Sequence, residues 1–217
     1  MKKAIVLLSG GLDSTTTLYF AKDKGYEIHC LIFDYAQRHR KEISAAIRIA
    51  KAAEAKYYVS KIHLPWKGSA LLDKHISLPT KRGRGIPATY VPARNTIFLS
   101  FALSFAEAIK AHVIFIGANH IDYSGYPDCR PDYFKEFDRL IKLATKAGVE
   151  GINIKIITPL INKNKAEIIR LGNKLGVPYD LTWSCYKGGK RPCGECDSCK
   201  LRQKGFKVLG LKDPLLN

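Results

Sequence analysis

A chain of 217 residues with 46% hydrophobic residues can bury a substantial core, which excludes a disordered protein. The formal net charge of +17 favours anionic partners such as nucleotides, RNA or acidic small molecules, although a solvated lysine-rich surface explains it equally well. No apolar run reaches the ~20 residues of a membrane span, and the first one is shorter than the ~7–15-residue core of a signal peptide. We therefore expect a cytoplasmic protein that does not enter a membrane.

Short apolar segments alternate with segments of helical periodicity along most of the chain. Strands are predicted at 4–8, 28–33, 57–64, 113–116 and 152–157. Residues 41–54 carry apolar side chains on one helical face, and residues 94–109 are apolar nearly all round, which predicts a buried helix. The alternation predicts an α/β fold with a doubly wound, mainly parallel sheet that binds ligands at the carboxyl ends of its strands.

We expect an α/β domain, residues 1–180, and a cysteine-containing segment, residues 181–217, that packs on it. Two long Gly/Pro-containing connections, 65–92 and 117–131, interrupt the α/β pattern. Both adjoin the sheet edge where a ligand is expected, so we interpret them as functional loops, with an ordinary surface excursion as the alternative.

The first predicted strand runs directly into the segment SGGLDS, residues 9–14. This segment fits neither GxxxxGK[ST] nor GxGxxG, but a strand that ends in glycines before a helix offers free backbone N–H groups to phosphate. It resembles the pyrophosphate loop of ATP-pyrophosphatase enzymes, which cleave ATP between the α and β phosphates. Ser9, Ser14 and Thr15 can donate hydrogen bonds, and Asp13 can orient the loop or a Mg²⁺ ion. The residues predicted to hold ATP are Leu8, Ser9, Gly10, Gly11, Leu12, Asp13, Ser14, Thr15, Thr16, Thr17 and Leu18.

Four of the six cysteines lie close together near the end of the chain. Cys193, Cys196 and Cys199 form two overlapping CxxC steps, and Cys185 supplies a fourth thiolate, which matches a tetrahedral Cys₄ zinc site. Four thiolates leave no open position for water, so a structural metal is favoured. An iron–sulfur cluster or a redox CxxC remains an alternative. Cys30 lies in a predicted strand and is expected to pack in the core.

The chain resembles the QueC family of queuosine and archaeosine biosynthesis nearly from end to end. The resemblance rests on SGGLDST, FDYAQRH (33–39), YVPARN (90–95), GANHIDYSGYPDCRP (117–131), TPLINKNKAEI (158–168) and the cysteine cluster. Ala36 stands where the family is expected to have glycine, which restricts that turn only slightly.

The resemblance implies a nitrile-forming ligase. The family converts 7-carboxy-7-deazaguanine and ammonia into 7-cyano-7-deazaguanine by adenylating first the carboxylate and then the amide, consuming two ATP with Mg²⁺. The residues implied to act on the phosphates and the reacting groups are Asp13, Ser14, Arg38, Arg94, Arg130 and Lys165. Candidate contacts to the deazaguanine are Asn119, Asp122, Tyr123, Tyr126 and Asp128, each of which is also a reasonable turn former or helix cap.

Two other functions use the same features. A tRNA thiolation enzyme would adenylate a base with the same loop, but it needs a reactive or cluster-binding cysteine near the nucleotide, for which Cys129 is the candidate, and usually an RNA-binding domain. A zinc-stabilised nucleotide-binding module without catalysis would not need the additional polar loops. We therefore expect small-molecule partners, free ammonia and no direct nucleic-acid binding, and a homodimer is compatible with the sequence.

Overall fold

The computed structural model describes residues 1–79, 85–122 and 125–216. Five parallel strands form one sheet in the order β3-β2-β1-β4-β5. The strands are β1 (Lys3–Leu7), β2 (Glu27–Asp34), β3 (Lys56–Lys61), β4 (Val113–Ile116) and β5 (Lys155–Ile157). The strand order reverses between β1 and β4, which is where a doubly wound sheet opens a crevice for a ligand. The predicted fold class is confirmed.

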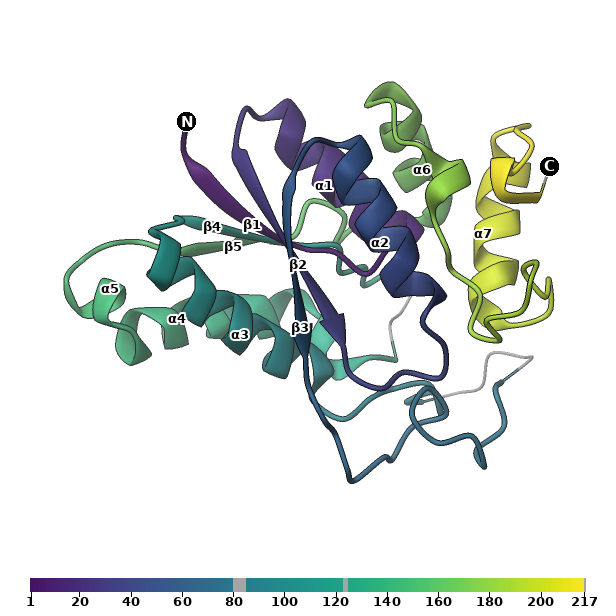
Figure 1. Cartoon of the computed structure of the whole chain (residues 1–217), viewed down its shortest axis with the longest axis horizontal. Coiled ribbons are helices and arrows are strands. Elements are labelled where there is room, and N and C mark those ends of the chain that lie inside the picture. Colours follow the sequence, from purple (N-terminus) through teal and green to yellow (C-terminus); the bar gives the residue numbers. More distant parts are fainter. Residues whose placement is uncertain (80–84, 123–124, 217) are drawn as a thin grey trace.

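Helices cover both faces of the sheet (Figure 1). The helices are α1 (Leu12–Asp23), α2 (Lys41–Ala52), α3 (Arg94–Ile109), α4 (Pro131–Ala144), α5 (Lys146–Val149), α6 (Lys165–Lys174) and α7 (Asp197–Val208), with 3₁₀ turns at Pro127–Cys129, Tyr179–Leu181 and Pro214–Leu216. Ala4 and Val6 of β1 pack in the core with α1 and α2, whereas Ile5 and Leu7 pack with α3 and α4. Alternate strand side chains thus build two cores, one on each face.

Two predicted strands are shorter in the structure because the pairing with their neighbours covers only part of each apolar run. The strand expected at 57–64 stops at Lys61, which pairs with Asp34, the last residue of β2. The strand expected at 152–157 begins only at Lys155, which pairs with Val113, the first residue of β4. A strand in a parallel sheet is defined by its pairing, so the apolar run alone overestimates its length.

The prediction that residues 94–109 form a buried helix holds for one face of the helix only. The helix has the predicted bounds, and Leu99 and Ala106 are completely buried. Phe101, however, is 45% exposed, because α3 lies along one face of the sheet and turns its other side to solvent. No helix within the described part of the chain is long and apolar enough to cross a bilayer.

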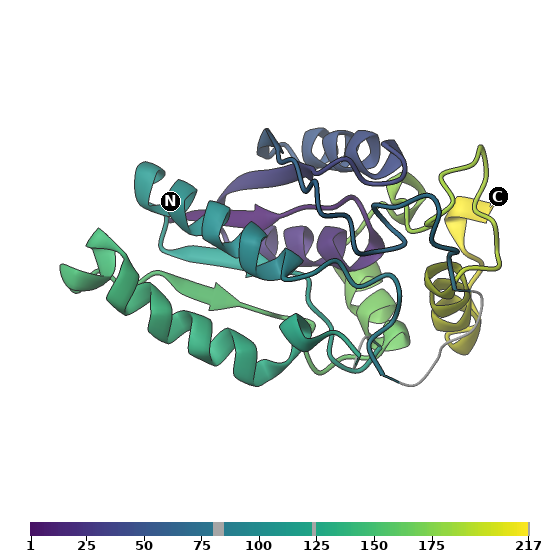
Figure 2. The same ribbon diagram turned by 90° about the horizontal axis from the view of Figure 1, so that it is seen from below.

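The segment 181–217 packs on the α/β unit at the carboxyl end of the sheet, where α6 and α7 lie side by side (Figures 1 and 2). The backbone N–H of Trp183 donates to the Gly10 carbonyl at 2.8 Å. Arg202 of α7 is buried and donates to both carboxylate oxygens of Asp213 and to the Tyr179 carbonyl. The Trp183 hydrogen bond ties the C-terminal segment to the glycine loop, and the Tyr179 contact ties α7 to the α/β unit. The domain boundary at residue 180 stays a prediction.

Ala36 adopts a left-handed backbone conformation with a φ of 59° in the turn after β2. Because glycine adopts this conformation without steric cost, Ala36→Gly is expected to stabilise the fold by about 0.5–1 kcal/mol, net of the entropy glycine adds to the unfolded chain. Thermal unfolding measures the effect. Ala108→Gly, at an exposed position inside α3, is the matched control and should destabilise the fold by about the same amount. A lower melting temperature for Ala36→Gly would contradict this account.

Candidate active site

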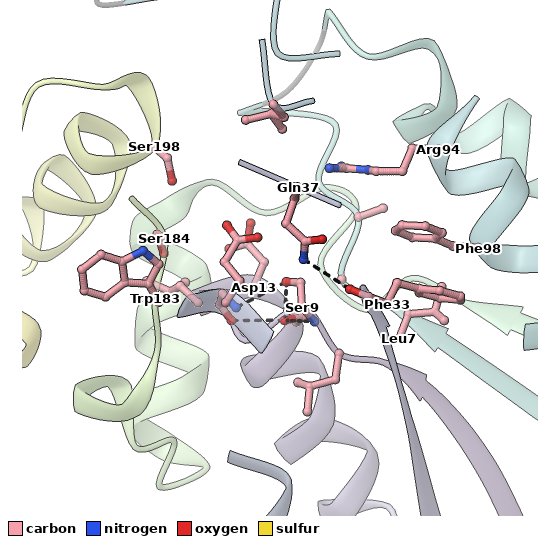
Figure 3. A pocket seen from close by; sticks show the side chains of 18 of the residues that line it. Leu7, Ser9, Asp13, Phe33, Gln37, Arg94, Phe98, Trp183, Ser184 and Ser198 are labelled. Carbon is pink, nitrogen blue, oxygen red and sulfur yellow. Dashed lines mark hydrogen bonds between the residues drawn. The ribbon is translucent and has the colours of Figure 1, made fainter. Parts of the chain in front are cut away.

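A cavity of about 240 Å³ lies at the carboxyl ends of β1, β2 and β4, where the strand order reverses. The glycine loop and the start of α1 form one wall, and α3 contributes Arg94 and Phe98 on the opposite side (Figure 3). Trp183, Ser184 and Ser198 of the C-terminal segment form a further wall (Figure 3). The cavity therefore occupies the position expected for a ligand in this class of fold.

The glycine loop is arranged to hold an anion. Ser9 Oγ lies 3.0 Å from Ser14 Oγ and accepts from the backbone N–H of Gly11 at 3.3 Å. Gly11 is the N-cap of α1 and has no side chain to occupy the free N–H groups of the first turn. These N–H groups and the positive end of the helix are therefore available to a phosphate group in the cavity.

Two glycines allow close backbone approach at this site. A Cβ atom on Gly10, which has a φ of 81°, would lie 2.4 Å from the Glu42 carbonyl oxygen and 2.6 Å from the Ala46 nitrogen. A Cβ atom on Gly117 would lie 2.9 Å from the Ser14 nitrogen. The loop is thus held between the start of α2 and the end of β4.

Gly10→Ala is expected to destabilise the protein by about 2–4 kcal/mol, because it adds backbone strain and a clash with the backbone of α2. Denaturant unfolding measures the loss. Gly25→Ala is the matched control, since Gly25 has a φ of 75° but nothing lies within 4 Å of its added Cβ. That control should cost only about 1 kcal/mol. Equal losses for the two variants would show that the contact with α2 is unimportant.

Asp13 and Lys165 form a largely buried ion pair in the lining of the cavity, although 152 positions separate them in the sequence. Lys165 Nζ lies 2.7 Å and 2.8 Å from the two carboxylate oxygens of Asp13, and 3.5 Å from a carboxylate oxygen of Asp122. Lys165 is the first residue of α6, whose start is fixed by a capping box between Asn164 and Glu167. The cap therefore positions a cation beside the glycine loop.

Arg94 and Glu42 bring opposite charges to the lining of the cavity, where the charge of Arg94 acts on Glu42. Burial opposes the charge on Arg94, but Tyr35, Tyr126 and Asp128 outweigh that effect and raise its pKa. Burial raises the pKa of Glu42 to about 7, and the positive charge of Arg94 limits the rise. Phe33 and Phe98 stack with their ring centroids 4.0 Å apart and line the cavity beside Arg94 (Figure 3).

Most of the predicted site residues meet at this cavity. Those that line it are Leu8, Ser9, Gly11, Leu12, Asp13, Ser14, Arg38, Arg94, Asn119, Tyr126 and Lys165. Arg38 donates to the carbonyls of Lys74 and Ile76, so its guanidinium also fixes the following loop. Asn119 donates to the Lys163 carbonyl and accepts from the Asp122 backbone, so it too supports a loop.

Other predicted residues lie outside the cavity lining. Thr15, Thr16, Thr17 and Leu18 are buried inside α1, and each threonine hydroxyl donates to a carbonyl one turn earlier. Gly10, within the glycine loop, packs against the backbone of α2. Asp122 contacts Lys165. Asp128 accepts from the Asn95 backbone at the start of α3, and Arg130 is exposed and donates to the Pro127 carbonyl. Tyr123 lies outside the described residues. The catalytic and binding roles of all these residues stay predictions.

Sequence reasoning missed several residues of the cavity wall, chiefly Tyr35, Gln37 and Glu42. Tyr35 and Gln37 lie within the FDYAQRH motif, directly after β2. Glu42 lies in the first turn of α2, which starts at the carboxyl end of the sheet. Glu42 could have been found from the sequence, because it is a carboxylate at the start of a helix that directly follows a strand and a family motif.

The four C-terminal cysteines lie together. One ligand atom from each of Cys185, Cys193, Cys196 and Cys199 lies within 4.8 Å of the others. Four thiolates on one zinc ion at ~2.3 Å are about 3.8 Å apart, so a small rearrangement accommodates the ion. A four-iron cluster fits less well because each of its thiolates binds a different iron atom. Hydrogen bonds from Cys196 and Cys199 lower the pKa of Cys185, and backbone N–H groups of Glu195 and Cys196 donate to Cys193 Sγ. The cluster fits a single thiophilic ion.

The remaining cysteines have the character of core residues. Burial raises the pKa of Cys30 to about 12, and Cys30 is completely inaccessible to solvent in β2, as expected. Cys129 lines the cavity, but burial raises its pKa to about 11, helped by the neighbouring carboxylate of Asp128. A thiol with such a pKa is a poor nucleophile at neutral pH.

The fold and the glycine loop define a doubly wound α/β protein with an anion-binding loop at the carboxyl ends of its strands. Similar folds occur in an NMN synthetase from Francisella tularensis, with a TM-score of 0.53, 15% identity, and coverage of 97% of this chain and 78% of that one. A predicted subunit of a tRNA methyltransferase from Methanocaldococcus jannaschii is also similar, with a TM-score of 0.52, 18% identity, and coverage of 80% and 75%. At these identities, the likeness shows the fold alone.

Residues 3–210 match the family described as queuosine biosynthesis protein QueC, and the chain belongs to that family. A 7-cyano-7-deazaguanine synthase from Nostoc punctiforme is 58% identical, with 99% of each chain covered. A synthase of the same name from Dechloromonas aromatica is 55% identical, with 100% of this chain and 98% of the other covered. The family resemblance is confirmed, and the chain is an enzyme of the ligase type.

Proposed function

We propose that this enzyme converts 7-carboxy-7-deazaguanine and ammonia into 7-cyano-7-deazaguanine through two adenylated intermediates, consuming two ATP. The observation that carries the proposal is a phosphate-binding helix start that opens into a cavity lined by both Lys165 and Arg94. The names of the relatives supply the product, and the resemblance to the family supplies the substrates.

The residues present suit the two adenylation steps. Ser9, Ser14 and the first-turn N–H groups of α1 bind the departing pyrophosphate, and Lys165 offsets its charge. A substrate oxygen attacks the α-phosphorus, and the P–O bond to pyrophosphate breaks. Ammonia then forms the amide C–N bond and displaces AMP. In the second round, adenylation of the amide oxygen makes it a leaving group, so that the nitrile forms as AMP departs.

The apolar wall suits a flat heterocycle. Phe98 and Phe33 present stacked aromatic rings to the cavity, and Tyr126 closes it from the 117–131 connection. Arg94 lies beside these rings and has the charge required to hold a substrate carboxylate. We assign the deazaguanine to this side of the cavity and ATP to the glycine loop.

We assign Zn²⁺ to the four cysteines and a structural role to the ion. Four thiolates give a closed tetrahedral set, and the cluster holds the Trp183 loop against the glycine loop through the Trp183–Gly10 hydrogen bond. Mg²⁺ would enter with the phosphates of ATP, with Asp13 as the nearest protein carboxylate, and would offset charge on the departing pyrophosphate. Metal analysis that finds iron would contradict the zinc assignment.

The thiolation alternative is weaker than the ligase. Cys129 is the candidate cysteine for thiolation. Its raised pKa and its burial oppose formation of the thiolate that thiolation requires. The four cysteines near the C-terminus belong to the four-thiol cluster. We therefore propose small-molecule substrates, free ammonia, no direct RNA contact and a cytoplasmic location.

We also propose a homodimer that forms through β3. This strand is at the edge of the sheet, and Tyr57, Tyr58 and Val59 are exposed on it. An edge strand with exposed apolar side chains is a ready surface for a second strand. Sedimentation velocity at micromolar concentration tests the proposal, with a dimer expected. A monomer at every concentration would contradict it.

The experiment that tests the function measures whether nitrogen from ammonium enters the product. Purified enzyme with ATP, Mg²⁺, 7-carboxy-7-deazaguanine and ¹⁵N-ammonium is expected to yield the nitrile with one ¹⁵N atom, detected by mass spectrometry. Reactions that omit ATP or ammonium are the controls. Absence of both the labelled amide and the labelled nitrile, in protein that binds ATP, would contradict the proposal.

A further inference from the structure

Most charged side chains that line the cavity are already paired within the described part of the chain. Asp13 is held by Lys165, and Arg202 is held by Asp213 behind the wall of the C-terminal segment. Arg38 is bound to the carbonyls of Lys74 and Ile76. These groups are fixed before any ligand arrives, and Arg94 is hydrogen-bonded to Tyr35, which leaves Glu42 as the charge best able to respond to a ligand.

The Glu42 carboxylate accepts no hydrogen bond from the described residues, although it lines the cavity. The charged and titratable groups that act on it are Arg94 of α3 and Cys185 of the C-terminal segment. Its backbone is fixed, because the Glu42 carbonyl packs against Gly10 of the glycine loop. A partly buried carboxylate that lacks protein donors is costly unless a ligand supplies them.

The proposed reaction, on which this inference rests, creates a need for such a group. Ammonia is almost wholly protonated in neutral water, and ammonium has no lone pair with which to attack the adenylate. An enzyme that draws on ammonium, the abundant form, needs a group that binds a small cation and removes its proton close to the acyl carbon. Asp13 is unsuited to this task because Lys165 already occupies its two oxygens.

We propose that Glu42 is a catalytic residue that binds ammonium in the cavity and accepts its proton. The carboxylate accepts N–H hydrogen bonds from the ion, one N–H bond breaks, and the proton passes to a carboxylate oxygen. The freed lone pair of ammonia forms the C–N bond as the bond from the acyl carbon to AMP breaks. A second proton leaves the new C–NH₃⁺ group with solvent, and Glu42 releases its own proton afterwards.

The acidity of Glu42 in the fold suits this role. Burial raises its pKa to about 7, so that it accepts a proton at neutral pH more readily than an exposed carboxylate. Arg94 keeps enough of the ionised form present to attract the cation. A Mg²⁺ ligand or a contact to the deazaguanine amino group is the competing role, and each gives a different result in the test below.

The test separates adenylation from ammonia attack. Glu42→Gln is expected to keep carboxylate-dependent exchange between ATP and labelled pyrophosphate within about threefold of wild type, but to lower amide formation from ammonium by about 10²–10³-fold. Hydroxylamine, which is mostly unprotonated at neutral pH, should restore capture of the adenylate as the hydroxamate to near the wild-type rate. Glu54→Gln, at an exposed position just after α2, is the matched control and should leave all three rates unchanged.

Three results would overturn the proposal. Amide formation at the wild-type rate in Glu42→Gln would show that Glu42 is not the base. A higher KM for the carboxylate in the exchange reaction would assign Glu42 to the deazaguanine, and a raised Mg²⁺ requirement would assign it to the metal. Melting temperature and zinc content show whether the variant folds, and Glu42→Asp replaces it if it does not. Absence of carboxylate-dependent exchange in wild type would instead refute the proposed function.

Discussion

Asp13→Ala is expected to lower substrate-dependent AMP release by about 10³-fold while the protein remains folded. Asp13 lies in the first turn of α1, and its carboxylate holds the buried ammonium group of Lys165 beside the phosphate-binding loop. Without it, Lys165 loses the carboxylate that holds it at hydrogen-bonding distance, and the contact with Asp122, at 3.5 Å, is longer, so the cation moves away from the position that suits pyrophosphate. The loss should fall mainly on kcat, because the pair acts on charge that develops as pyrophosphate departs.

Asp23→Ala is the matched control, since Asp23 is the last residue of the same helix and its side chain is about half exposed. It should leave AMP release unchanged. Circular dichroism and melting temperature check the fold of both variants. Normal AMP release in Asp13→Ala, with a native fold, would remove the ion pair from the mechanism.

Cys185→Ser is expected to lose most of its zinc and to melt roughly 10 °C lower, the shift that corresponds to about 3–4 kcal/mol in a protein of this size. Wild-type protein should contain about one zinc per chain, as a single Cys₄ site requires. Cys185 is separated in sequence from the other three cysteines, and its Sγ accepts the Cys193 backbone N–H at 3.3 Å. The ion therefore joins the Trp183 loop to the start of α7, and activity should fall as a consequence.

Cys30→Ser separates metal loss from general instability. Cys30 is completely buried in β2, so a serine there should lower the melting temperature while the zinc content stays unchanged. Zinc is measured by atomic emission on dialysed protein. A Cys185→Ser protein that kept its zinc and its melting temperature but made no nitrile would show that Cys185 acts in catalysis.

The hydrophobic periodicity of the sequence predicted which helices and strands form, but it predicted less well where they end. The helix expected at 41–54 starts at Lys41 but ends at Ala52, because Glu54 turns into the left-handed region. The ends of β3 and β5 depend on where β2 ends and β4 begins, which no local pattern contains. The apolar character of α3 similarly predicted a helix but not that Phe101 faces solvent.

The candidate site was predictable where its residues are consecutive. The glycine loop and the CxxC steps are readable because their function depends on spacing within a few residues. The Asp13–Lys165 pair joins α1 to α6, and the position of Glu42 depends on the packing of Gly10 against α2. Such contacts arise only when distant elements meet. The acidity of Glu42 also depends on burial, which composition does not reveal.

The ratio of AMP released to nitrile formed tests the central claim most directly. Purified enzyme is supplied with saturating ATP, Mg²⁺ and ammonium and a limiting amount of 7-carboxy-7-deazaguanine, and both products are counted by chromatography. Two adenylation rounds predict two AMP per nitrile, equal amounts of pyrophosphate, and no AMP without the carboxylate. ADP in place of AMP, or one AMP per nitrile, would contradict the account.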